Sequence, residues 1–147
     1  MSIRSFHEIY LHVNWHCEGS RRMISETMEP ELHQFIAGYC KQLSGVYFHG
    51  VGGIETHLHV VLQIVPSLAP SEVIGRMKGA SAHEMNRRFG PGALLWQAGF
   101  GIVSFAKLDL PGVQRYVANQ RQHHTQGTIK GPLEATGAIE DDDRVSG

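Results

Sequence analysis

The chain has 147 residues, of which 41% are hydrophobic, and its formal net charge is −1. This length fits one domain whose core is large enough to fold without disulfides, and its two cysteines, Cys17 and Cys40, lie far apart in the sequence. Met1 leads into polar residues, and no apolar run approaches the roughly 20 residues that cross a bilayer, so we expect a cytoplasmic protein without a membrane span.

The charge is unevenly distributed along the chain. Residues 132–147 contain five acidic residues and one basic residue, which leaves 12 basic and 9 acidic residues before them. The low apolar content near the C-terminus predicts one folded domain over residues 1–128, followed by an acidic, flexible and solvated tail over residues 129–147. The folded part is therefore mildly basic, and we assign no function to the tail.

The first half of the chain predicts a strand, a helix and a hairpin. Pro30 suits the first turn of the helix, in which apolar residues recur at helical spacing. Gly52 and Gly53 mark the turn of the hairpin. The expected elements are a strand over residues 6–15, a helix over residues 29–43, and strands over residues 46–51 and 56–65.

The second half predicts a helix, a strand and a last helix, over residues 71–89, 94–106 and from residue 109 onward. Ser71 and Asp109 are candidate caps for the two helices, and Pro111 suits the first turn of the last one. Gly99 and Gly101 indicate a bend or bulge in the strand. This order predicts an α+β fold, a ferredoxin-like antiparallel sheet (βαββαβ) with an additional C-terminal helix.

His57 and His59 lie at the start of the second hairpin strand. Residues i and i+2 of a strand point to the same side, so the two ring nitrogens can converge on one ion. The opposite side of this strand is fully apolar and can face a core. An H-x-H pair also fits a structural or exposed role, but a metal gives two histidines a reason to share one side. Neutral imidazole suits manganese or zinc, whereas magnesium requires further oxygen ligands.

Tyr116 and Gln120 are one helical turn apart on the last helix and share one face. Tyr116 fits two roles, a core aromatic in an amphipathic stripe or a nucleophile. A buried amide at Gln120 needs a partner, and an ion held by the histidines would provide one. His124 is a rival third ligand, and His123 and His124 also fit ordinary surface positions that contact phosphate.

Three segments together resemble the single-tyrosine HUH transposases, which include the insertion-sequence-200-like enzymes and the transposases associated with repetitive extragenic palindromes (REP). The first is His57-Leu58-His59, the second is residues 95–101 (LWQAGFG), and the third is residues 116–124 (YVANQRQHH). The joint occurrence of these motifs in this order is more specific than any one of them. The resemblance covers about residues 5–125.

The resemblance implies a role for each motif residue. His57, His59 and Gln120 would bind a divalent metal, Mg²⁺ or Mn²⁺, and Tyr116 would be the catalytic nucleophile. The implied activity is a DNA transposase that nicks and rejoins single-stranded DNA at hairpin-bearing element ends through a 5′-phosphotyrosine intermediate. Family members commonly form homodimers in which the tyrosine helix of one subunit completes the site of its partner, and we expect the same here.

Six basic side chains on the predicted helices are candidates for contacts to the DNA backbone, although solvated helix faces explain them equally well. They are Arg76, Lys78, Arg87, Arg88, Arg115 and Arg121. Two other functions remain open from the sequence. One is a non-catalytic hairpin-DNA-binding protein, and the other is a metal-dependent phosphohydrolase in which the ion activates water.

Overall fold

The computed structural model describes residues 5–136 and contains a four-stranded sheet in the order β2-β3-β1-β4, with every neighbouring pair antiparallel. This strand order and the alternation of strands and helices confirm the predicted ferredoxin-like α+β fold. The strands are β1 (Ile9–His16), β2 (Val46–Ile54), β3 (His57–Ile64) and β4 (Gly101–Phe105). The α-helices are α1 (Met28–Gln42), α2 (Pro70–Phe89), α3 (Leu110–Ala118), α4 (Gln120–Gln126) and α5 (Gly131–Glu134), and two 3-10 turns span Glu18–Ser20 and Lys107–Asp109.

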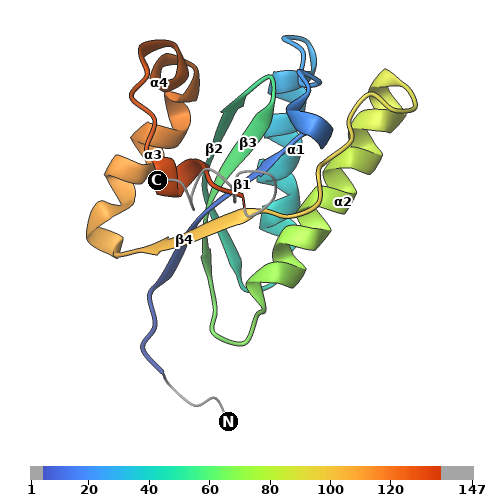
Figure 1. Cartoon of the computed structure of the whole chain (residues 1–147). Helices are drawn as coiled ribbons and strands as arrows, with labels where there is room; N and C mark the ends of the chain where they lie inside the picture. Colours follow the sequence, from blue (N-terminus) through green and yellow to red (C-terminus); the bar gives the residue numbers. More distant parts are fainter. Residues whose placement is uncertain (1–4, 137–147) are drawn as a thin grey trace.

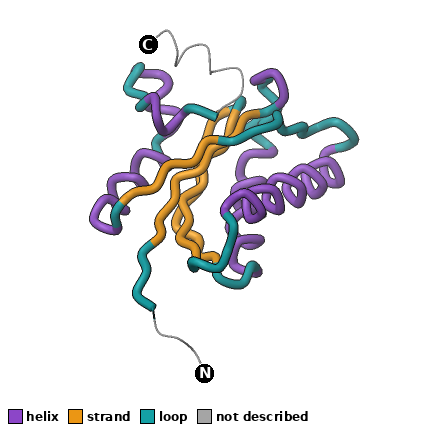
Figure 2. Tube along the Cα trace, turned by 60° about the horizontal axis from the view of Figure 1, so that its bottom comes forward, coloured by secondary structure: helices purple, strands orange, loops and turns teal. Residues whose placement is uncertain are grey.

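Helices cover both faces of the sheet (Figures 1 and 2). Helices α1 and α2 lie on one face, and α3 and α4 lie on the other. The large core is under α1 and α2, and it receives the apolar side of β3, namely Leu58, Val60, Leu62 and Ile64. A smaller cluster on the other face joins Val61 to Tyr116 and Val117. The two sides of β3 therefore face the directions that its alternating pattern predicts, and the histidine side lies under α3.

Gly52 and Gly53 lie inside β2, so the predicted position of the hairpin turn is wrong. The turn falls at Glu55 and Thr56, and Gly52 pairs with His59 across the ladder. A Cβ atom on Gly52 would overlap the carbonyl oxygen of Val117. Glycine is present here because the strand backbone passes directly against α3, and the sequence signal for a turn was in fact a signal for close approach.

Several predicted boundaries also shift. Residues 94–100 lie outside β4; Trp96 forms an isolated bridge with Cys17, and the backbone N–H of Gln97 donates to the carbonyl oxygen of His16 at the end of β1. The predicted last helix is divided at Asn119 into α3 and α4. Neither Ser71 nor Asp109 caps a helix with its side chain: α2 begins at Pro70, and Asp109 makes no capping hydrogen bond.

The segment that follows α4 packs back onto the sheet. Helix α5 contacts β4 and β1, and the amide nitrogen of Asn14 donates a hydrogen bond to the carbonyl oxygen of Leu133. Residues 131–136 thus differ from the solvated tail expected there, while residues 137–147 lie outside the described part of the chain. Among the described residues, no helix is both long and apolar enough to span a bilayer.

Candidate metal centre and nucleophile

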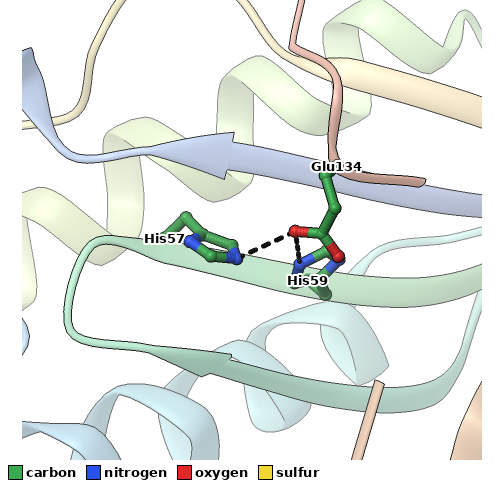
Figure 3. Close-up of side chains that lie close together, drawn as sticks. All are labelled: His57, His59 and Glu134. Carbon is green, nitrogen blue, oxygen red and sulfur yellow. Dashed lines mark hydrogen bonds and ion pairs between the residues drawn. The ribbon is translucent and has the colours of Figure 1, made fainter. Parts of the chain in front are cut away.

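Two buried histidines and one partly buried carboxylate lie close together (Figure 3). His57 and His59 extend from β3 and are 2% and 0% exposed. The Nε2 atom of each ring is 3.1 Å from Oε1 of Glu134. The three candidate ligand atoms lie within 4.8 Å of one another, which is a spacing that one ion can bridge.

Glu134 is the site residue that the sequence analysis missed. It lies at the end of α5, 75 residues beyond His59, in a segment whose composition resembles a solvated tail. Burial alone would raise the pKa of its carboxyl group, but hydrogen bonds from His57 and His59 outweigh burial and hold that pKa below the usual range. Glu134 is therefore an ionised carboxylate, and no local sequence pattern marks it.

Tyr116 places its hydroxyl group at the same carboxylate. The hydroxyl donates a hydrogen bond to Oε2 of Glu134 and accepts one from the backbone N–H of Lys130 at 3.0 Å. Burial and then the contact with Glu134 raise the pKa of the phenol to about 12, so the phenol is neutral at physiological pH. Tyr116 belongs to the small apolar cluster, as an aromatic residue in an amphipathic stripe would, and its hydroxyl also reaches the candidate metal ligands.

Gln120 lies beside the cluster, as its spacing from Tyr116 predicts. Its Oε1 atom is 3.4 Å from Nε2 of His57 and 3.2 Å from Nε2 of His124, and its Nε2 atom donates to the carbonyl oxygen of Tyr116. His124 also approaches Oε1 of Glu134, at 3.3 Å. The ring of His123 stacks on that of Tyr116 at 4.5 Å. Both histidines thus lie at the rim of the cluster.

A second row of polar side chains lies beside the cluster, on the neighbouring strand β1. His12 and Asn14 are each 2% exposed, and the ring of His16 stacks on that of His57 at 4.7 Å. The sequence of β1, IYLHVNWH, alternates strictly between apolar and polar side chains, and this alternation was the available signal for a polar face. Asn14 holds α5 through Leu133, so β1 also positions Glu134.

Residues 5–120 match the family described as "Transposase IS200 like", a match that covers most of the chain. The chain belongs to this IS200-like transposase family. No curated protein matches it.

Two solved structures share the fold of this transposase. A candidate transposase from Deinococcus radiodurans R1 has a TM-score of 0.65 and 17% identity, over 82% of this chain and 96% of that one. A REP-associated tyrosine transposase bound to a REP hairpin has a TM-score of 0.60 and 12% identity, over 99% of this chain and 87% of that one. At these identities, the likeness establishes the fold.

The six basic residues proposed for DNA contacts are divided between the two faces of the transposase. Four of them, Arg76, Lys78, Arg87 and Arg88, lie on α2, across the sheet from the histidine cluster. Arg87 and Arg88 bind Glu84, and Lys78 donates to the carbonyl oxygens of Gln97 and Gly99. On the cluster's face, Arg115 is exposed, and Arg121 binds Glu29 and Glu55.

The donor set fits a divalent metal. Two buried imidazole nitrogens and one ionised carboxylate converge, and the amide oxygen of Gln120 lies beside them. Mixed nitrogen and oxygen ligands suit Mn²⁺ well, and water or phosphate oxygens would complete the shell of Mg²⁺. His57, His59 and Gln120 are the ligands expected from the sequence, and Glu134 adds the negative charge that this set lacked.

Proposed function

We propose that this transposase cuts and rejoins single-stranded DNA by phosphodiester transfer to Tyr116, with a divalent ion held by His57, His59, Gln120 and Glu134. One observation carries this proposal: the hydroxyl of Tyr116 and the Nε2 atoms of both histidines meet at a single carboxylate. A nucleophile and a candidate metal site therefore lie within the reach of one phosphate group.

The chemistry assigned to Tyr116 is an in-line displacement at the scissile phosphorus. The phenol oxygen forms a bond to phosphorus, the bond from phosphorus to the 3′ oxygen breaks, and that oxygen takes a proton from water and leaves as a 3′-hydroxyl. The product is a 5′-phosphotyrosine. Attack by a second DNA 3′-hydroxyl reverses the step and joins strands, and because the phosphodiester energy is retained, no nucleotide cofactor is required.

The proton of Tyr116 must leave during the attack, since a neutral phenol is a weak nucleophile. Oε2 of Glu134 accepts the hydrogen bond from that proton, and it is the group placed to receive it as the bond to phosphorus forms and the phenol oxygen becomes acidic. When bound, a divalent ion would supply charge neutralisation at the non-bridging phosphate oxygens. Gln120 donates a hydrogen bond to the backbone carbonyl oxygen of Tyr116, and it would thereby fix the position of the nucleophile relative to the metal ligands.

We propose hairpin-bearing single-stranded DNA as the substrate. The REP-associated tyrosine transposase that shares this fold is bound to a hairpin, which supports the substrate class. Arg115 is our first candidate for backbone contacts because it is exposed on the face of the candidate site. A homodimer with shared sites stays an expectation from the family; in this structure Tyr116 contacts Glu134 of its own chain, and sedimentation at micromolar concentration measures the assembly.

The test is incubation with Mn²⁺ and 3′-labelled single-stranded DNA from the flanks of the gene, followed by denaturing electrophoresis. Label that migrates with the wild-type protein and not with Tyr116→Phe supports the proposal. Free cleaved DNA with both proteins would support the phosphohydrolase instead. A hairpin that both proteins shift on a native gel, without any cleavage on the denaturing gel, would identify a DNA-binding protein.

A further inference from the structure

His12 is a buried histidine to which neither the motif nor the proposed chemistry gives a role. It lies on β1, is 2% exposed, and its Nε2 atom is 2.8 Å from Nδ1 of His59. Its other ring nitrogen, Nδ1, is buried and has no hydrogen-bond partner among the described residues. His12 therefore makes one directed contact through its ring nitrogens, and that contact is with a proposed metal ligand.

The contact with Glu134 determines where the protons lie without an ion. Nε2 of His59 faces an ionised carboxylate oxygen at 3.1 Å, so this nitrogen carries the hydrogen and donates it. Nδ1 of His59 is then an acceptor, and Nε2 of His12 donates to it. Nδ1 of His12 is left as a bare lone pair. In this state neither ring has a buried N–H group without an acceptor.

An ion at the proposed site requires the opposite arrangement. Nε2 of His59 must present its lone pair to the metal, so the hydrogen moves to Nδ1. Nδ1 then donates to Nε2 of His12, whose own hydrogen moves to Nδ1. The hydrogen bond between the rings is kept with its direction reversed, and the number of protons on the pair does not change.

We propose that His12 is a positioning residue that holds the ring of His59 by Nδ1 and reverses their shared hydrogen bond when Nε2 passes from Glu134 to a metal ion. The inference rests on the proposed metal site. His57 needs no such partner, because Thr56 Oγ1 lies 3.0 Å from its Nδ1 and a hydroxyl group can either donate or accept. An imidazole can do both only by exchanging its tautomer.

The reversed hydrogen bond is less stable than the metal-free one, so the pair stays in the metal-free arrangement until an ion binds. In the reversed state the N–H group at Nδ1 of His12 is buried without an acceptor among the described residues, whereas the metal-free state leaves only a lone pair. The pair of histidines thus supports the contact between His59 and Glu134 in the absence of an ion. Binding of the ion must overcome this preference.

The decisive experiment reads both ring nitrogens of each histidine by long-range ¹H–¹⁵N NMR, in metal-free protein and after titration with diamagnetic Zn²⁺. We expect the hydrogen of His12 on Nε2 without metal and on Nδ1 with metal, with the converse exchange in His59. If the rings of His57 and His59 respond to Zn²⁺ while His12 keeps its hydrogen on Nε2, the inference is overturned and the metal site stands. If no ring responds, the proposed metal site fails and this inference fails with it.

Variants give a second, independent measurement. His12→Leu removes the partner of Nδ1, and we expect Mn²⁺ affinity by calorimetry to fall about tenfold or more. His12→Gln offers an amide that can either donate or accept, and we expect its affinity to stay within about threefold of wild type. The matched control is His49→Leu, which removes a histidine bonded to Gln63 rather than to a ligand. Equal losses in His12→Leu and His12→Gln would contradict the positioning role.

Discussion

The hydroxyl of Tyr116 donates a hydrogen bond to the carboxylate of Glu134, 18 residues further along the chain. The same carboxylate lies 3.1 Å from both His57 and His59, so the proposed nucleophile and the proposed ligands share one anion. The reactivity of the phenol and the affinity for metal are thereby coupled through Glu134.

The first prediction concerns the ionisation of the nucleophile. Burial and then the contact with Glu134 raise the pKa of Tyr116 to about 12. Glu134→Gln removes the negative charge and keeps the shape of the side chain, so the pKa of Tyr116 should fall by about one unit. Ultraviolet titration of tyrosinate, with Tyr116→Phe subtracted, measures this value. The control, Glu84→Gln, removes a carboxylate on α2, and a fall of equal size there would contradict the assignment.

The second prediction concerns metal affinity. His57→Ala and His59→Ala should each weaken Mn²⁺ binding about a hundredfold, because each removes one of the converging ligand atoms. Gln120→Ala should cost about tenfold, since its amide oxygen is a neutral ligand at the edge of the set. Calorimetry of metal-free protein with Mn²⁺ measures all three. His83→Ala, an exposed position on α2, serves as the control, and full affinity in His59→Ala would disprove the ligand set.

The third prediction tests how α5 is positioned. A Cβ atom on Gly101 would overlap the carbonyl oxygen of Ala135 and lie 2.9 Å from Oδ1 of Asn14. Gly101→Ala should therefore displace α5 and with it Glu134, although residue 101 contacts no proposed ligand. Mn²⁺ binding should weaken about as much as in Glu134→Ala, the variant that removes the carboxylate itself. Overpacking of this kind costs about 1–3 kcal/mol of unfolding free energy, which urea denaturation measures.

Gly50→Ala is the matched control for that experiment. A Cβ atom on Gly50 would meet only the side chain of Val61, at an ordinary contact distance of 3.8 Å. Metal affinity in Gly50→Ala should equal that of wild type. Equal losses of affinity in the two glycine variants would show that strand substitutions act on the site through general destabilisation.

The fourth prediction is acid sensitivity. Burial, and then the neighbouring His59, lower the pKa of His12 to about 3, against 6.5 in an unfolded chain. Between these values the unfolded state takes up a proton that the folded state excludes, so the unfolding free energy should fall as pH decreases from 6.5 towards 3. One such group contributes about 1.4 kcal/mol per pH unit.

Urea denaturation of the metal-free protein at several pH values measures this slope. His12→Gln should have a shallower slope than wild type, because its residue 12 cannot take up a proton in the unfolded state. An unchanged slope in His12→Gln would contradict the burial of a neutral His12.

Most of what the sequence predicted came from local patterns, the alternation of apolar and polar residues in strands and the spacing of residues on helices. The period of two in β3 separates His57 and His59 from an apolar side, and the structure keeps that separation. The helical spacing of Tyr116 and Gln120 holds across the break at Asn119. The same reasoning was available for β1, where strict alternation puts His12 on the histidine side of the sheet.

Contacts between distant segments account for what the sequence did not predict. Glu134 precedes an acidic, weakly apolar stretch, and its role depends on Asn14 holding the carbonyl group of Leu133. Gly52 was interpreted as a turn because a glycine pair is a local turn signal, whereas the constraint on it is the backbone of α3. Neither constraint leaves a mark within a short window of sequence.

The ligands of the proposed site come from parts of the fold that differ in local stability. His57 and His59 belong to β3, an interior strand paired on both sides, whereas Glu134 ends a four-residue helix that contacts the sheet through few elements. Hydrogen exchange should therefore be slow at the histidines and fast at α5, because α5 can detach without opening the sheet. During synthesis, the ribosome adds His57 and His59 before Glu134. All four strands therefore leave the ribosome before the carboxylate does, and the sheet can form before Glu134 joins the site.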